Sequence, residues 1–102
     1  VPDTIPPQAA AFDFAPPRPT PAKGAVTLAW TLPAPAVVRL EIHDLSGRRV
    51  RRLVPEEAET GGPHQHDWDG FDDDGRRVPP GLYVARLVVN GSARGRRIPF
   101  LR

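Results

Sequence analysis

The sequence contains neither cysteine nor methionine among its 102 residues. The absence of cysteine excludes disulfide bonds, thiolate metal sites and thiol nucleophiles, and makes the fold indifferent to the redox state of its compartment. Lysine is nearly absent too, because Lys23 is the only one and the other cationic side chains are arginines. The formal net charge of +2 is too small to indicate a nucleic-acid-binding protein by itself.

Long apolar runs are also missing, so the sequence predicts no membrane span. Serine is scarce, since Ser46 and Ser92 are the only two, and both stand in turn-like contexts without an activating base. Neither a phosphate-binding loop nor a paired general acid and base is present. We therefore expect a non-enzyme without a cofactor. The chain begins at Val1 rather than at an initiator methionine, which we interpret as the start of a processed, mature chain.

Proline, by contrast, is abundant, with 14 residues in the chain. A chain of this length forms one domain. We divide it into a Pro-rich extended N-terminal arm, residues 1–16, and a folded domain, residues 17–102. Phe12 and Phe14 point the same way in an extended arm and require a hydrophobic environment. The rings of this arm must therefore be buried somewhere.

Apolar residues alternate with polar ones in the first half of the domain, which predicts half-buried strands. The pattern is clearest in residues 25–32 and recurs in residues 37–43. A turn at residues 44–47 leads into residues 48–54, so the last two runs are expected to form a hairpin.

The second half of the domain shows the same pattern with stronger turn signals. Residues 56–63 are expected to form an acidic, glycine-ended loop. Asn90-Gly91 is typical of a tight hairpin turn and would join strands at residues 81–89 and 92–101. About seven short strands, with turns roughly every ten residues and no helical period, predict an all-β, Ig-like (fibronectin III-like) antiparallel β-sandwich.

The stretch from Trp68 to Tyr83 organises this prediction. Gly70 and Gly75 stand where the chain must turn sharply, and prolines near the end of the stretch prevent a helix. An aromatic residue on each side of these turns would fix the strand register, because both rings must reach the same core. We expect the core to contain Leu28, Trp30, Leu40, Ile42, Trp68 and Tyr83.

Several short motifs together resemble a known family from about Phe12 to Arg102. The chain is similar to the Ig-like module of the flagellar hook-capping protein and of type IX secretion C-terminal sorting domains. This resemblance implies an extracellular or periplasmic sandwich used for attachment, assembly or sorting, with no catalytic residues. The matching segments are Ala15-Pro-Pro-Arg-Pro19, Leu32-Pro33, Asp44-Leu-Ser-Gly-Arg-Arg-Val50, Trp68-Asp-Gly70, Asp73-Asp-Gly-Arg76, Gly81-Leu-Tyr83 and Arg96-Arg-Ile98.

Acidic residues near the central turn raise the question of a metal site. Asp69, Asp72 and Asp74, with their neighbours, supply the oxygen ligands that calcium prefers. Their spacing misses the alternating pattern of a calcium loop, because Phe71 stands where a third ligand is due. Aspartate also forms tight turns by bonding to its own backbone, and this explains the run without a metal. We therefore predict no metal site.

Two histidines, His64 and His66, would lie on one face of a strand, a spacing that can hold zinc with a third ligand. Because Trp68 shares that face, we interpret both as partly covered residues at the edge of the core.

Arginines crowd the expected strand at residues 48–54. They could bind an anion or the carboxylates of a surface glycan. A charged edge strand that resists uncontrolled pairing would show the same run. Nucleic acid is a remote third alternative. The arginines are Arg48, Arg49, Arg51 and Arg52.

Three residues fit glycosylation patterns. Asn90-Gly-Ser92 matches the N-glycosylation acceptor pattern, which is compatible with an exposed hairpin turn. Thr4 and Thr20 lie in Pro-rich surroundings similar to O-glycosylated stalks.

The sequence is compatible with two functions. In the first, the protein is a secreted structural subunit that forms a homopolymer, with Ile5, Phe12 and Phe14 of one copy's arm adding a strand to the next copy. In the second, it is a C-terminal sorting or adhesion module of a larger secreted protein. A rival to strand donation is that residues 12–15 form the first strand of their own sandwich.

Overall fold

Residues 12–101, the part of the chain that the computed structural model describes, contain eight strands and no helix, and hence no helix that could cross a membrane. The predicted antiparallel β-sandwich is confirmed, with one strand more than expected. In chain order the strands are β1 (Asp13–Phe14), β2 (Arg18–Lys23), β3 (Ala25–Leu32), β4 (Ala36–His43), β5 (Arg49–Glu59), β6 (Gly62–Trp68), β7 (Gly81–Val89) and β8 (Ser92–Leu101).

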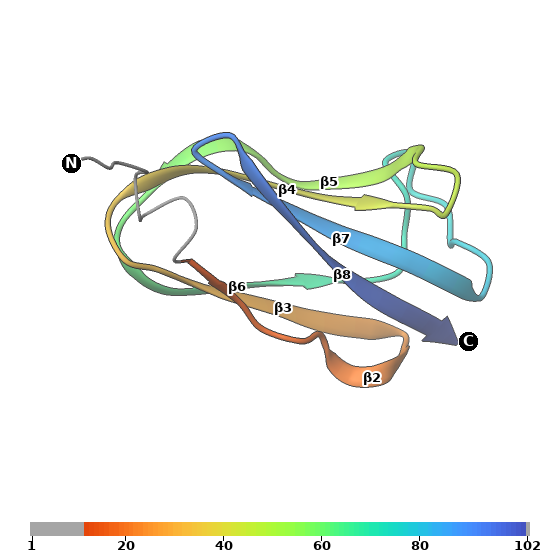
Figure 1. Ribbon diagram of the computed structural model, residues 1–102. Coiled ribbons are helices and arrows are strands. Elements are labelled where there is room, and N and C mark those ends of the chain that lie inside the picture. The colour runs from red at the N-terminus through yellow and green to blue at the C-terminus, as the bar shows by residue number, and fades with distance from the viewer. Residues whose placement is uncertain (1–11, 102) are drawn as a thin grey trace.

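The strands form two layers that face one another across the core (Figure 1). In the first layer β3 pairs with β6 on one side and with β1 on the other. The second layer has the order β8–β7–β4–β5. Strand β2 joins the layers, because it pairs antiparallel with β3 and parallel with β8. All expected hairpins are present, including the two-residue turn at Asn90-Gly91, where both residues have positive φ.

The core lies between the layers and is built by the alternation that the sequence shows. In β3, for example, Val26, Leu28, Trp30 and Leu32 are buried, while Thr31 is exposed. Strand β7 buries every second residue from Tyr83 to Val89. The six core residues expected from the sequence are all buried: Leu28, Trp30, Leu40, Ile42, Trp68 and Tyr83.

An aromatic cluster holds the two layers together at the centre of the fold. Trp68 of β6 packs edge-on against Tyr83 of β7, with ring centroids 5.5 Å apart, and in a tilted arrangement against Phe100 of β8, with centroids 5.2 Å apart. Its indole Nε1 donates to the carbonyl oxygen of Phe71 at 2.9 Å. Gly70 is required beside the cluster, because a Cβ there would lie 2.5 Å from the Phe100 ring and its φ is +82°. The prediction that both aromatics reach one core is confirmed.

The expected loop at residues 56–63 is wrong. Strand β5 continues to Glu59, and β6 already begins at Gly62. Three residues of β5, Glu57, Ala58 and Glu59, pair with the start of β4. This end of β5 shows no apolar alternation, because it lies at the border of the sheet and its residues are mostly exposed. Pro55, which has no N–H, is tolerated in such an edge strand.

The first residues that the structure describes lie against the sandwich of their own chain. Phe12 and Phe14 are buried in the core of their own chain, with 1% and 3% of their surface exposed. Phe14 pairs with Trp30 of β3, and the Ala15 N–H donates to the carbonyl oxygen of Ala29 at 2.9 Å. In this structure Phe14 therefore belongs to the first strand of its own sandwich, β1, and Phe12 packs into the core immediately before it. Ile5 lies outside the described residues.

Strand β8, in the second layer, also contacts the segment from Phe12 to Phe14. The Arg96 Nε donates to the carbonyl oxygen of Phe14 at 2.8 Å. The Arg94 guanidinium lies over the Phe12 ring, 4.7 Å from its centroid. Because contacts from both layers hold it, this short segment closes the open side of the sandwich between β3 and β8.

Candidate functional site

The outward side of the second layer carries an excess of arginine. In β4 and β7, and in β8 from Ile98 onward, the inward positions are filled by core residues, so the alternate positions lie on the outward side. Five charged residues on this outward side lie near one another in the strand register, and we call them the basic face: Arg39, Glu41, Arg52, Arg86 and Arg97.

Strand register brings these side chains together. Glu41 of β4 lies opposite Arg86 of β7 and, on its other side, opposite Arg52 of β5. Arg39 is two residues earlier on β4, and Arg97 of β8 pairs with Val84, two residues from Arg86. Directly opposite residues have Cβ atoms about 5 Å apart and diagonal ones about 7–8 Å apart, so the five side chains form one cluster.

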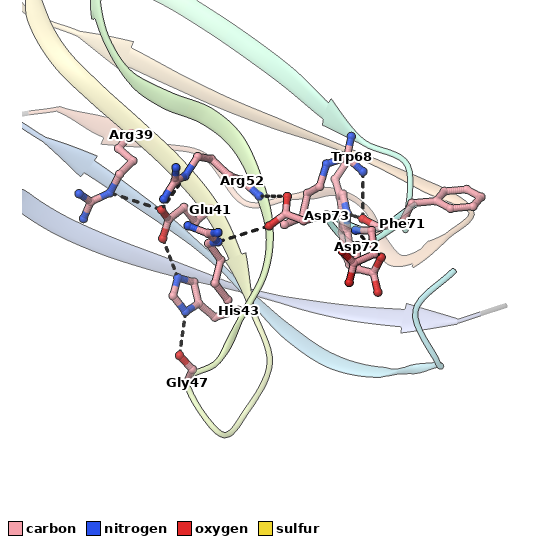
Figure 2. A network of polar contacts seen from close by, with 12 residues as sticks. Arg39, Glu41, His43, Gly47, Arg52, Trp68, Phe71, Asp72 and Asp73 are labelled. Carbon is pink, nitrogen blue, oxygen red and sulfur yellow. Dashed lines mark hydrogen bonds and ion pairs between the residues drawn. The ribbon is translucent and has the colours of Figure 1, made fainter. Parts of the chain in front are cut away.

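Glu41 is the centre of this cluster and is only 8% exposed. Figure 2 shows its carboxylate with Arg39, His43 and Arg52 around it. Its Oε1 lies 3.1 Å from His43 Nε2, and its Oε2 lies 3.4 Å from Arg52 Nε and 3.7 Å from Arg39 Nε. The last distance is too long for a hydrogen bond, and Arg39 Nε is shielded from solvent without a hydrogen-bond acceptor.

The cationic neighbours determine the ionisation of Glu41. Burial alone raises the pKa of this carboxyl group, since it disfavours the charged form. The hydrogen bond with His43, the charge of Arg39 and the contact with Arg52 together outweigh burial, and the net effect lowers the pKa of Glu41 below its usual value. Glu41 is therefore a carboxylate at neutral pH.

One carboxylate does not balance this face. Arg39 and Arg52 share Glu41. Neither Arg86 nor Arg97 has a carboxylate at ion-pair distance within residues 12–101. The basic face thus combines four guanidinium groups with one buried carboxylate.

The aspartates predicted to form turns do so, in two five-residue turns with the same bonding pattern. In the turn that begins at Asp44, the Oδ1 atom accepts from the backbone N–H of Ser46 at 2.9 Å and of Arg48 at 3.1 Å. In the turn that begins at Asp72, Oδ1 accepts from Asp74 and Arg76, both at 2.9 Å. A glycine of positive φ occupies the fourth position of each turn. Both sequences read Asp-x-x-Gly-Arg.

The second of these turns covers the free edge of β5. The Asp73 N–H donates to the carbonyl oxygen of Val50 at 2.9 Å, and its Oδ1 accepts from the Arg52 N–H at 2.9 Å. The Asp73 carboxylate also lies 3.3 Å from Arg49 Nε. Strand β5 is the end strand of its layer, so these bonds occupy backbone groups that another chain could otherwise pair with.

The arginine run of β5 therefore has partners inside the chain. Arg48 pairs with Asp44 at 3.4 Å, and Arg51 pairs with Asp69 at 3.3 Å while donating to the carbonyl oxygen of Phe71 at 3.0 Å. With the pairs of Arg49 and Arg52 described above, each arginine of the run has a carboxylate neighbour. The charged edge strand is confirmed.

The weak metal candidates do not come together as a ligand set. Asp69 Oδ1 accepts from the Phe71 N–H at 3.0 Å, and Asp72 closes its own turn. Asp74 is exposed. Within residues 12–101 there is no group of three or more His, Asp or Glu side chains placed to hold a metal ion.

The two histidines of β6 are half-buried beside Trp68, as predicted. His64 stacks on Trp30 with ring centroids 6.1 Å apart, and its Nε2 lies 2.7 Å from the carbonyl oxygen of Thr60. Its Nδ1 lies 3.7 Å from Glu59, which also accepts from Trp30 Nε1 at 3.0 Å. His66 contacts the carbonyl oxygen of Asp67. These contacts serve packing at the edge of the core.

The glycosylation candidates lie in separate places. Asn90 is exposed at the tip of the β7–β8 hairpin, where its Oδ1 accepts from the Val37 N–H at 2.9 Å. Thr20 is exposed in β2. Thr4 lies outside the described residues. Their modification remains a prediction.

The basic face is the feature that the sequence analysis missed. Its arginines are scattered over four strands, and only the strand register brings them to one surface. The sequence does contain one indication of this face. Glu41 is the acidic residue of its strand, and Arg39 and His43, two residues away on either side, share its face.

Comparisons with known proteins agree with this architecture. PorU from Porphyromonas gingivalis, in a dimeric latent form, matches with a TM-score of 0.70 and 24% identity over 88% of this chain. PorZ, a bacterial surface component of the type IX secretion system of the same organism, matches with a TM-score of 0.56 and 18% identity over 95% of this chain. At these identities the two likenesses show the fold alone. A comparison with curated proteins finds no match.

FlgD from Pseudomonas aeruginosa matches with a TM-score of 0.54 and 27% identity over 70% of this chain. The chain spans 56% of that FlgD chain, 12% of PorZ and 9% of PorU, which is less than two thirds of each. The family model of the FlgD Ig-like domain matches residues 18–92, which is most of the chain. The fold, the spacing of the turns and this match agree, and the chain belongs to the FlgD Ig-like domain family.

Proposed function

We propose that this chain is a non-catalytic attachment module of a larger bacterial surface or secretion protein, located outside the cytoplasm. The supporting observation is that its chemistry-bearing residues are used in holding the sandwich. Turn aspartates, edge arginines and core-edge histidines all have partners within the fold. The function of the module therefore depends on its surface, above all on the basic face.

The similar proteins support the same role. Modules of this fold make up a small part of PorU and PorZ, proteins many times longer than the module. FlgD carries a module of the same family. A domain that recurs as a small part of larger surface and secretion proteins is suited to position them or attach them.

Self-assembly by strand donation is less well supported. Phe12 and Phe14, the proposed anchors of a donated strand, fill the core of their own chain. Asp73 and Pro55 also protect the long edge of β5 from pairing with another chain.

Two measurements test this proposal. Fused to the C-terminus of a secreted reporter in the bacterium that makes it, the module should retain the reporter at the cell surface, whereas the reporter alone should be released into the medium. The purified chain should sediment as a monomer at micromolar concentration. Release of the fused reporter, or filaments of the purified chain, would contradict the attachment role.

A further inference from the structure

We propose that the basic face is a docking surface for an acidic patch on a partner protein, with the partner's carboxylates bound by Arg86 and Arg97 and supported by Arg39. This inference rests on the proposed attachment function and specifies its partner.

The positive charges of the basic face indicate an acidic partner. Neither Arg86 nor Arg97 has a carboxylate at ion-pair distance within residues 12–101, and the two lie diagonally on adjacent strands. Guanidinium groups at this separation, about 7–8 Å between Cβ atoms, can each bind one carboxylate in bidentate geometry. The Arg39 side chain is 36% exposed and shares one carboxylate, Glu41, with Arg52, so its guanidinium group can contribute a further donor.

Aliphatic side chains between the arginines indicate a protein partner. Leu82, Val84 and Val88 alternate with Arg86 along the outward side of β7 and are half-buried. A protein surface with both carboxylates and aliphatic groups would cover these side chains, in the manner of the apolar core of a protein interface.

The shape of the face favours a macromolecule over a small ligand. Two hollows on this chain lie away from the face: one of about 720 Å³ lies between the Asp44 and Asp72 turns, and one of about 560 Å³ lies beside β1. The fold extends 50 × 23 × 20 Å. One side of it can therefore offer the roughly 800 Å² per partner that a stable protein interface buries.

A second copy of the same face is a poor partner. A two-fold symmetric contact would bring two surfaces, each with four arginines and one glutamate, against one another. Like charges opposed in this way cost binding energy rather than contribute to it. The excess positive charge therefore requires an acidic surface on a different molecule.

The experiment titrates the ¹⁵N-labelled chain with three anionic probes and follows its backbone amide resonances. The probes are a 20-residue poly-L-glutamate peptide, a galacturonate oligomer of equal charge, and vesicles containing phosphatidylglycerol. We expect the peptide to bind most tightly, with shifts concentrated in residues 37–43, 84–88 and 93–97. Stronger binding of either other probe to this face would overturn the assignment to a protein partner.

Charge reversal identifies the binding residues. The double variant R86E/R97E should weaken peptide binding by about tenfold or more, the loss expected when a bidentate contact worth ~1.4 kcal/mol is removed. The control variant R18E/R76E changes the net charge by the same amount. Both of its arginines are exposed and have no ion pair in the described part of the chain, so their replacement should not disturb the fold. It should weaken binding by less than about threefold, the share due to long-range charge.

The results that would contradict the proposal can be told apart. Equal losses in the two variants would reduce the effect to net charge, and shifts centred on Arg48 or Arg76 would place the site elsewhere. If R86E/R97E proves unfolded by circular dichroism, R86Q/R97Q replaces it with the same expected direction. In the reporter assay, surface retention that survives R86E/R97E would refute the basic face but leave the attachment function standing, whereas release of the unmutated fusion would refute the function.

Discussion

Replacing Trp68 with alanine should destabilise the domain more than any other single truncation in the aromatic cluster. The side chain is fully buried, and it contacts both Tyr83 and Phe100 across the two layers. Truncating a buried aromatic residue costs about 3–5 kcal/mol. The carbonyl oxygen of Phe71 also loses the indole donor, which adds on the order of 1 kcal/mol.

We therefore expect W68A to lower the free energy of unfolding by about 4–5 kcal/mol, a large share of the 5–15 kcal/mol typical of such domains. Urea denaturation followed by far-ultraviolet circular dichroism measures this quantity without relying on the tryptophan that is removed. W68F keeps a ring in the cluster and should lose only about 1–2 kcal/mol. L45A, at a leucine that is 70% exposed, is the neutral control. A loss below about 1 kcal/mol for W68A would show that the ring does not hold the layers together.

The remaining predictions concern the turns and the basic face. G70A should cost at least about 2 kcal/mol more than G75A, because both glycines have φ near +80° but only at Gly70 would a Cβ meet Phe100, at 2.5 Å; equal losses in urea denaturation would contradict this close approach. The difference in unfolding free energy between wild type and E41Q should be greatest above the usual carboxyl pKa of 4.5 and should shrink as the pH falls through the lower pKa of folded Glu41. A difference that does not change with pH would show that the arginines and His43 do not stabilise the Glu41 carboxylate.

The fold was predictable because its strands carry their burial pattern in the sequence. The alternation from Val26 to Leu32 reports directly which side of β3 faces the core. Asn90-Gly91 specifies its turn through the positive φ of both residues. The Asp-x-x-Gly-Arg turns could also have been recognised as a pair, since the same spacing occurs twice.

The placement of Phe12 and Phe14 was not predictable in the same way. Two aromatics in an extended, Pro-flanked segment need a hydrophobic groove, but the sequence does not say whether the groove belongs to the same chain. The answer depends on contacts distant in sequence, above all the bond from Arg96 to the Phe14 carbonyl oxygen, 82 residues away.

The end of β5 and the basic face escaped prediction for related reasons. Residues 55–59 lie in a strand because β4 pairs with them, although their own composition resembles a loop. Glu41 is buried by arginines that reach it from β4 and β5, not by apolar neighbours. Properties that arise from register between distant strands leave little trace in local sequence.

The most direct test of the account measures the stability of the chain with residues 1–16 deleted. If Phe12 and Phe14 complete their own sandwich, the deletion should lower the free energy of unfolding by more than about 4 kcal/mol, since it removes two buried aromatic side chains. The full-length chain should meanwhile unfold at the same urea concentration whether it is dilute or concentrated, because it is a self-contained module. A truncated chain as stable as the full-length one, or a full-length stability that rises with protein concentration, would show that the segment belongs to a neighbouring copy and would contradict the account.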